Sequence, residues 1–137
     1  MTTTATKIFV NVSVKDLARS KAFFSKLGYT FNPQFTNDDA ACMVISEDIF
    51  AMLLTEAHFK QFTTKPIADA TKTTETIIAL SAASKDAVNT IVEKAFAAGA
   101  KRYAEPNDHG FMYQWGFEDL DGHIWEHAWM DPSALQK

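Results

Sequence analysis

The sequence predicts an α+β fold made of two related βαβββ modules whose sheets enclose a cavity. Two observations carry this prediction. A strand–helix–three-strand pattern occurs twice, and Gly28 and Gly99, which end the two expected helices, lie about half the chain apart. Each module alone would leave an apolar sheet face uncovered, so two modules together complete a core. We expect one domain over residues 1–137, with module one at about 7–64 and module two at about 75–130.

The first module opens with an aliphatic strand over 8–14 that carries Asn11 on its other face. Asp16 is a plausible N-cap for the helix that follows, which ends before Gly28. Two strand-like runs come next, joined by a hairpin, and then a short helix with Thr55 as its cap. These segments cover 40–46, 50–54 and 55–63, and the polar segment 65–74 links the modules.

The second module repeats this order. A strand is expected over 76–81, Ser84 caps an amphipathic helix, and Gly99 ends it. Three strands follow, at 101–104, 111–118 and 124–129, and a turn at 119–122 joins the last two.

Composition excludes several classes of function. The net charge is −4 and no Lys/Arg cluster occurs, so the chain lacks the electrostatic footprint of a nucleic-acid binder. No apolar run is long enough to span a membrane, and the Thr-rich residues 1–6 do not form a signal peptide, which predicts a cytoplasmic protein. Cys42 lies in an apolar run, which favours a buried small side chain over a reactive thiol.

Two motifs near the ends of the repeated pattern resemble a known superfamily. "FVNVSVKDLARSKAFFSKLGY" (9–29) looks like the opening signature of the vicinal oxygen chelate superfamily, which includes glyoxalase I, bleomycin-resistance proteins, fosfomycin-resistance enzymes and extradiol dioxygenases. "FEDLDGHIWEHAW" (117–129) resembles its closing signature, an aspartate–glycine turn followed by a strand with a glutamate. The resemblance covers nearly all of residues 7–130 and is strongest to small bacterial glyoxalase-like proteins.

The resemblance implies that the curved, mixed sheets of the two βαβββ modules lie side by side and form an open, U-shaped cavity, with a site on the cavity floor. A divalent metal, with Zn, Ni, Mn, Mg or Fe as candidates, would chelate two adjacent oxygens of a substrate and stabilise negative charge there. Glu126 matches the carboxylate position in the last strand, as metal ligand or catalytic base, and Asn11 aligns with the first-strand ligand. As alternatives, Glu126 could face solvent or pair with a lysine, and Asn11 could bind a substrate carbonyl or a buried polar group.

The remaining ligand positions of that pattern are apolar. The second-module position falls near Ala79, which has no donor atom, and the strand at 50–54 offers none either. The sequence therefore retains one carboxylate and one amide where three or four ligands are usual, and this leaves open whether any metal binds.

Three further residues are candidates for contact with a substrate. His109 lies in the loop expected at 107–110, where it could act as an acid or base. Gln114 and Trp115 lie on opposite faces of one expected strand, whose aromatic face either packs on a helix or lines the cavity. Arg102 and Tyr103 are expected at the surface.

Two functions follow from these observations. The first is a glyoxalase-like enzyme of unassigned substrate, such as a metal-dependent lyase or isomerase acting next to a carbonyl. The second is a metal-free small-molecule or drug-binding protein of the bleomycin-resistance type. Either would bind a small molecule, and the resemblance also implies a homodimer.

Overall fold

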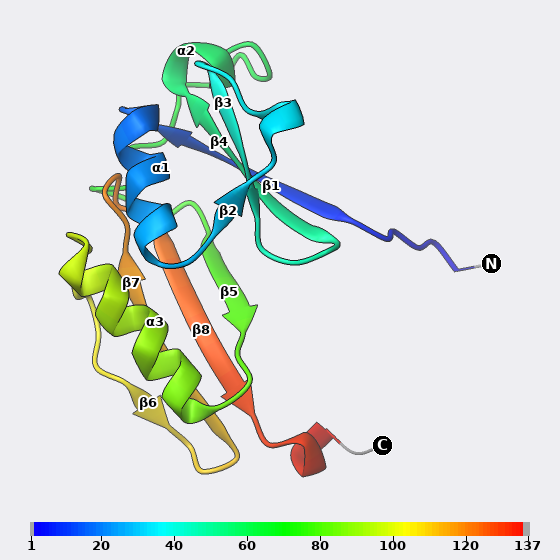
Figure 1. Cartoon of the computed structure of the whole chain (residues 1–137), viewed down its shortest axis with the longest axis vertical. Helices are drawn as coiled ribbons and strands as arrows, with labels where there is room; N and C mark the ends of the chain where they lie inside the picture. Colours follow the sequence, from blue (N-terminus) through cyan, green and yellow to red (C-terminus); the bar gives the residue numbers. More distant parts are fainter. Residues whose placement is uncertain (1, 136–137) are drawn as a thin grey trace. The chain divides into compact units, whose positions relative to one another are not determined.

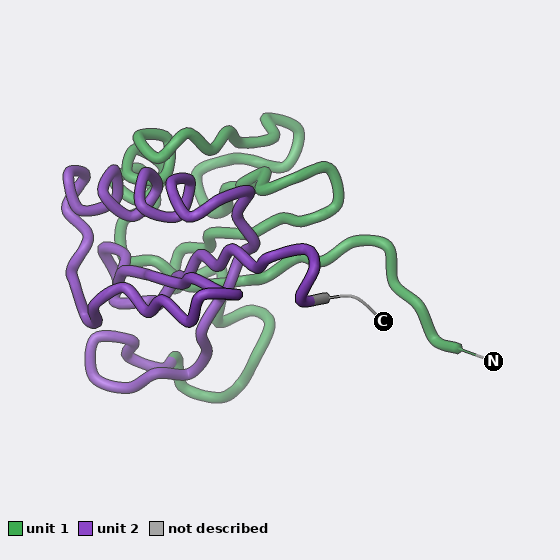
Figure 2. The backbone as a smooth tube through the Cα atoms, turned by 90° about the horizontal axis from the view of Figure 1, so that it is seen from below, with its two compact units in different colours: residues 1–67 green, residues 68–137 purple. Residues whose placement is uncertain are grey.

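The computed structural model describes residues 2–135, which form two compact units (Figure 2). The first unit ends at Ile67 and the second begins at Ala68, within the segment expected to link the modules. Within residues 2–135, no helix combines the length and apolar character needed to cross a membrane.

The first unit is one four-stranded mixed sheet with a covering helix (Figure 1). The strand order is β1-β4-β3-β2, in which β1 runs parallel to β4 and the other pairs are antiparallel. Its elements are β1 (Ile8–Val14), α1 (Leu17–Lys26), β2 (Thr30–Phe31), the 3-10 turn Pro33–Phe35, β3 (Ala40–Val44), β4 (Ile49–Thr55) and α2 (Glu56–Phe59).

The second unit has the same construction. Its strand order is β5-β8-β7-β6, again with one parallel pair, β5 with β8. Its elements are β5 (Ile77–Ser81), α3 (Lys85–Ala97), β6 (Asn107–Asp108), β7 (Met112–Glu118), β8 (Ile124–Met130) and the 3-10 turn Pro132–Leu135. The predicted class, α+β with two βαβββ modules and mixed open sheets, is confirmed.

In the first unit, the aliphatic face of the sheet packs on α1. Alternation along β1 buries Val12 and Val14 on this face, where Phe23 and Phe24 of α1 are also almost completely buried. Asp16 caps the helix as predicted, because its side chain accepts a hydrogen bond from the backbone N–H of Arg19 at 3.1 Å. Cys42 is 2% exposed, as expected for a small core side chain.

In the second unit, the aromatic face of β7 and β8 packs on α3. The ring of Trp115 meets Phe96 of α3 edge-on, with ring centroids 5.6 Å apart. The hydroxyl of Tyr113, two residues earlier, donates to Asn89 of the same helix. The aromatic stripe is therefore core, and this answers the question that the sequence left open. The other face of this sheet carries Gln114, Gly116 and Glu126.

Two predicted boundaries in the second unit were wrong. The strand expected over 101–104 is a single bridge, Lys101 to Glu118, because the following residues leave the strand path. The residues expected as loop at 107–108 instead form β6, which pairs with Gln114 and Tyr113 of β7.

Candidate functional site

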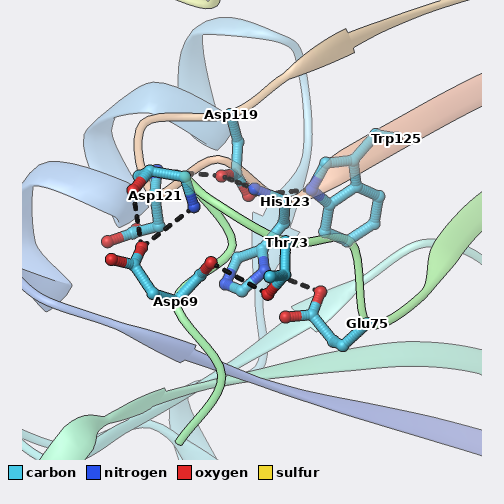
Figure 3. Close-up of polar contacts among 8 residues, drawn as sticks. Asp69, Thr73, Glu75, Asp119, Asp121, His123 and Trp125 are labelled. Atoms are coloured by element: carbon cyan, nitrogen blue, oxygen red, sulfur yellow. Dashed lines mark hydrogen bonds and ion pairs between the residues drawn. The ribbon is translucent and has the colours of Figure 1, made fainter.

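The β7–β8 turn is built around one buried carboxylate, Asp119 (Figure 3). Its Oδ1 accepts hydrogen bonds from the backbone N–H groups of Asp121 at 2.9 Å and His123 at 3.0 Å. Its Oδ2 accepts from the indole N–H of Trp125 at 2.8 Å. These bonds fix both the turn and the first residues of β8, and therefore the register of the strand that carries Glu126.

Burial raises the pKa of Asp119 above its usual 3.8. The nearby His123 and the three hydrogen bonds act in the opposite direction but do not cancel the effect of burial. A carboxylate with all these donors is committed to holding the turn. We assign Asp119 a structural role on this basis.

A strap formed by residues 69–75 lies against the same turn (Figure 3). Gly122 has φ +90° and allows the strap to approach, since a Cβ there would lie 2.7 Å from the carbonyl oxygen of Ala70. Glu75 Oε1 lies 3.6 Å from Nδ1 of the buried His123. The aspartate–glycine turn of the closing motif is thus required by backbone conformation and close packing.

Glu126 lies on the face of the sheet opposite α3. Its partners across the sheet are Ala79 of β5 and Gly116 of β7, so a half-buried carboxylate stands between two of the smallest residues. The next residue, His127, points to the other face, where it is 4% exposed and stacks on Phe117. Strand alternation therefore separates the adjacent carboxylate and imidazole.

A bulged segment along the edge of β7 brings a tyrosine to this carboxylate. Lys101 pairs with Glu118 and Asn107 pairs with Gln114, so residues 102–106 lie opposite the shorter run 115–117. Within this segment the guanidinium of Arg102 stacks over Phe96 and Trp115 on the helix side. The indole of Trp115 secures the segment by donating to the carbonyl of Ala104 at 3.1 Å.

Tyr103 lies on the opposite side from Arg102, over Gly116. Its hydroxyl donates to Glu126 Oε2 at 2.9 Å. A Cβ at Gly116 would lie 2.8 Å from that hydroxyl and 2.4 Å from the carbonyl oxygen of Trp125. Burial raises the pKa of the Tyr103 phenol well above its usual 10, and the hydrogen bond and negative charge of Glu126 raise it further.

Tyr103, expected at the surface, is half-buried, because the bulge folds it over the sheet. It lies 23 residues from Glu126 in sequence. The sequence signal that could have revealed it is Gly116, a glycine inside an aromatic strand, which marks a close approach to the strand.

Within the second unit, the structure brings one of the other predicted site residues, Gln114, to the face of Glu126. Gln114 is half-buried on that face, two residues from Gly116 along β7. Trp115 is 8% exposed on the α3 face, which leads us to leave it out of the site. His109 is exposed beyond β6, and Asn11, in the first unit, is exposed and donates to the Phe9 carbonyl at 3.3 Å.

Comparison with known proteins supports the resemblance read from the motifs. The family model "Bleomycin resistance protein-like N-terminal" matches residues 6–46. A hypothetical protein of S. aureus, SA1046, has a similar structure, with TM-score 0.76, 26% identity, and coverage of 92% of this chain and 95% of that chain. A glyoxalase/bleomycin resistance protein/dioxygenase family enzyme from Burkholderia phytofirmans PsJN gives TM-score 0.73 at 16% identity, covering 89% and 96%. This chain has the vicinal oxygen chelate fold.

Another protein with the vicinal oxygen chelate fold is the fosfomycin resistance protein FosX of Listeria monocytogenes. It gives TM-score 0.64 at 19% identity and covers 93% of this chain and 91% of its own. Among curated proteins, none is similar enough in sequence to match.

Register shows how the two modules of this vicinal oxygen chelate fold correspond. Asn11 pairs with Met52 in the first unit just as Ala79 pairs with Glu126 in the second. We call such a line of paired residues across a sheet a row. This row holds Asn11 on β1 in the first module and Glu126 on β8 in the second.

The donor set around Glu126 does not fit a resident divalent metal. Ala79 and Gly116 offer no donor atoms, and the Tyr103 phenol keeps its proton and already binds one carboxylate oxygen. Over residues 2–135, no three His, Cys, Asp or Glu side chains are grouped so that they could hold a metal ion. The arrangement can instead accept hydrogen bonds and balance positive charge.

Proposed function

We propose that this protein binds a small organic cation at Glu126, as a metal-free sequestering protein of the bleomycin-resistance type. The observation that carries the proposal is the burial of the Glu126 carboxylate and the neutral partner that it has. Glu126 is half-buried, and within residues 2–135 its hydrogen-bond partner is the neutral Tyr103 phenol, with no ion pair to Lys, Arg or His. Partial burial makes a carboxylate a better partner for a positive charge than one in open water, and a bound cation supplies that charge.

The distribution of charge along the chain supports a cationic ligand. Residues 1–67 carry 7 Lys/Arg and 6 Asp/Glu, whereas residues 68–137 carry 6 Lys/Arg and 11 Asp/Glu. The net negative charge of the chain therefore comes from the unit that holds Glu126. A negative field of this kind raises the local concentration of cations and excludes anions.

The surroundings of Glu126 favour an organic cation over a hydrated metal ion. The polar neighbours on this face are Ser81 at the end of β5 and Gln114 and Glu118 of β7. The other neighbours along β5, β7 and β8 are apolar, namely Ile77, Ala79, Ile124, Ala128, Met130 and Met112. Such a face can cover the hydrocarbon part of a ligand while the carboxylate contacts its charged head.

Calorimetric titration with benzylammonium, benzamidinium and neutral benzyl alcohol tests the proposal. We expect the cations to bind and the alcohol not to bind. Glu126→Gln should abolish cation binding while the melting temperature stays within a few degrees of that of the wild type. Calorimetry suits this chain because Trp115, Trp125 and Trp129 lie on the α3 face, where their fluorescence would respond poorly. Equal binding of cation and alcohol would contradict the proposal.

The metal-assisted lyase predicted from the sequence leads to the opposite expectation for metal binding. It requires metal to copurify with the protein, and it requires Zn, Ni, Mn, Mg or Fe to raise the melting temperature in a way that Glu126→Gln abolishes. Elemental analysis and thermal unfolding across this metal panel separate the two functions. Metal-dependent stabilisation lost in Glu126→Gln would favour the lyase.

The homodimer and the cytoplasmic location stay predictions. Seven large apolar side chains are more than one-third exposed in the described residues, Phe9 and Phe62 among them, which favours association. Light scattering on the eluting protein should give twice the 15.3 kDa mass of the chain.

A further inference from the structure

The hydrogen bond between Tyr103 and Glu126 determines what the pair can offer a ligand. A tyrosine hydroxyl has one proton, and here it points to Glu126 Oε2 at 2.9 Å. The phenol oxygen keeps acceptor capacity, and an ionised carboxylate is an acceptor only. The two side chains therefore present adjacent acceptor atoms and no donor.

The two positions directly across the sheet from Glu126 add no competing donor. Ala79 and Gly116 flank Glu126 and carry no polar side chain. Glu118, two residues from Gly116, is also half-buried, and its charge acts on Tyr103 in the same direction as that of Glu126. A ligand at the pair therefore encounters acceptors and negative charge, while the donor side chains on this face, Gln114 of β7 and Ser81 of β5, lie two residues along from Gly116 and Ala79.

Apart from Tyr103 itself, the aromatic side chains of the sheet that carries Glu126 face away from the carboxylate. Quaternary ammonium groups are typically held in cages of several aromatic rings. In β7 and β8, the five aromatic side chains alternate onto the α3 face, away from Glu126. These are Tyr113, Trp115, Phe117, Trp125 and Trp129.

We propose that the Tyr103–Glu126 pair selects organic cations with at least two N–H groups, namely primary ammonium, amidinium or guanidinium, over quaternary ammonium of equal charge. One N–H binds the free oxygen of the carboxylate and a second binds the phenol oxygen. Such charge-assisted bonds are stronger than neutral ones and depend on geometry, whereas a quaternary head can gain only unspecific attraction. This inference rests on the proposed function of the same site.

The test compares three probes of equal charge by calorimetric titration: benzylammonium, benzamidinium and benzyltrimethylammonium. We expect the two N–H-bearing probes to bind about 10- to 100-fold more tightly than the quaternary probe, as hydrogen bonds to charged groups predict. Tyr103→Phe should remove most of that preference and leave quaternary binding unchanged. Tyr113→Phe is the matched control, because its hydroxyl binds Asn89 on the α3 face, and it should keep the preference.

A second measurement needs no ligand. Ultraviolet titration of tyrosinate should show that the pKa of Tyr103 falls in Glu126→Gln, with Tyr103→Phe identifying the signal. An unchanged titration would show that the pair does not form and would overturn the inference.

The outcomes separate the inference from the function on which it rests. Equal affinity for all three probes, lost in Glu126→Gln, would keep the proposed function and overturn the selection by N–H groups. If Tyr103→Phe kept the full preference for the N–H-bearing probes over the quaternary probe, the selection by N–H groups would also be overturned. No binding of any probe would overturn both.

Discussion

Two adjacent residues of β8 meet opposite environments. Glu126 is half-buried beside a phenol, whereas the His127 side chain is almost fully buried on the α3 face. Burial disfavours the charged imidazole and lowers the pKa of His127 to about 4. The side chain therefore acts as a neutral core residue at physiological pH.

This burial predicts a pH dependence of stability. In the unfolded chain His127 has its usual pKa of 6.5, so as pH falls below that value the unfolded state takes up the proton first. Stability attributable to His127 is present above about pH 6.5 and falls towards about pH 4. Between about pH 7 and about pH 5 we expect a loss of about 2 kcal/mol in the free energy of unfolding.

Denaturant unfolding of wild type and His127→Gln across this range measures the effect. The comparison is needed because Asp119, whose pKa is raised by burial, contributes in the opposite direction. Parallel pH profiles for the two proteins would contradict the prediction.

Gly116 is the second residue whose surroundings determine the effect of a substitution on stability. Alanine inside a strand is normally better than glycine by about 0.5–1 kcal/mol, but here a Cβ would lie 2.4 Å from the Trp125 carbonyl oxygen and 2.8 Å from the Tyr103 hydroxyl. We expect Gly116→Ala to destabilise the protein by about 1–3 kcal/mol, measured by denaturant unfolding. Gln114→Ala, on the same face of β7, is the control and should be nearly neutral. A stabilised Gly116→Ala would show that the close approach does not exist.

Glu126 could be predicted from sequence, but its partner could not. The closing motif places a glutamate in the last strand, and alternation puts it opposite His127. Tyr103 is brought to it by a bulge whose extra residues carry no local signature, so sequence reading left it at the surface. Trp115 could not be assigned to a face until the contact with Phe96 was known.

Helix ends are the elements that local sequence determines best. The N-caps predicted at Asp16 and Ser84 both accept hydrogen bonds from the third helical residue, at 3.1 and 3.0 Å. Strand β1 has its predicted bounds, since aliphatic alternation is strong. Weak edge pairing is harder to predict, as the wrong strand at 101–104 and the missed strand at 107–108 show.

The cap of α3 gives a prediction at this scale. Ser84 Oγ accepts from the backbone N–H of Ala87, and α3 covers the aromatic face of the second sheet. Ser84→Ala should cost about 1 kcal/mol of unfolding free energy, while Ser84→Asp should keep most of the stability. Equal losses in both variants would show that capping is not the cause.

At the scale of the whole molecule, duplication repeats the backbone but not the chemistry. The row that holds Ala79, Glu126 and Gly116 in the second unit corresponds to Asn11, Met52 and Cys42 in the first. The first row lacks a carboxylate, and the first unit has almost no net charge. The repeat was readable from periodicity, whereas this difference in chemistry required the register between strands.

The charge of the second unit leads to a last prediction, which concerns ionic strength. Residues 68–137 carry five more acidic than basic side chains, spread over the unit, so part of the attraction for a cation comes from distant charges that only low salt leaves unscreened. Raising NaCl from about 20 to about 200 mM should weaken benzylammonium binding severalfold, because added salt shortens the Debye length. The hydrogen bonds of the Tyr103–Glu126 pair are short-ranged and should survive, so the preference for benzylammonium over benzyltrimethylammonium should stay constant while both affinities fall. Calorimetric titration at each salt concentration measures both quantities, and affinities that do not change with salt would show that the acidity of the unit plays no part in capture.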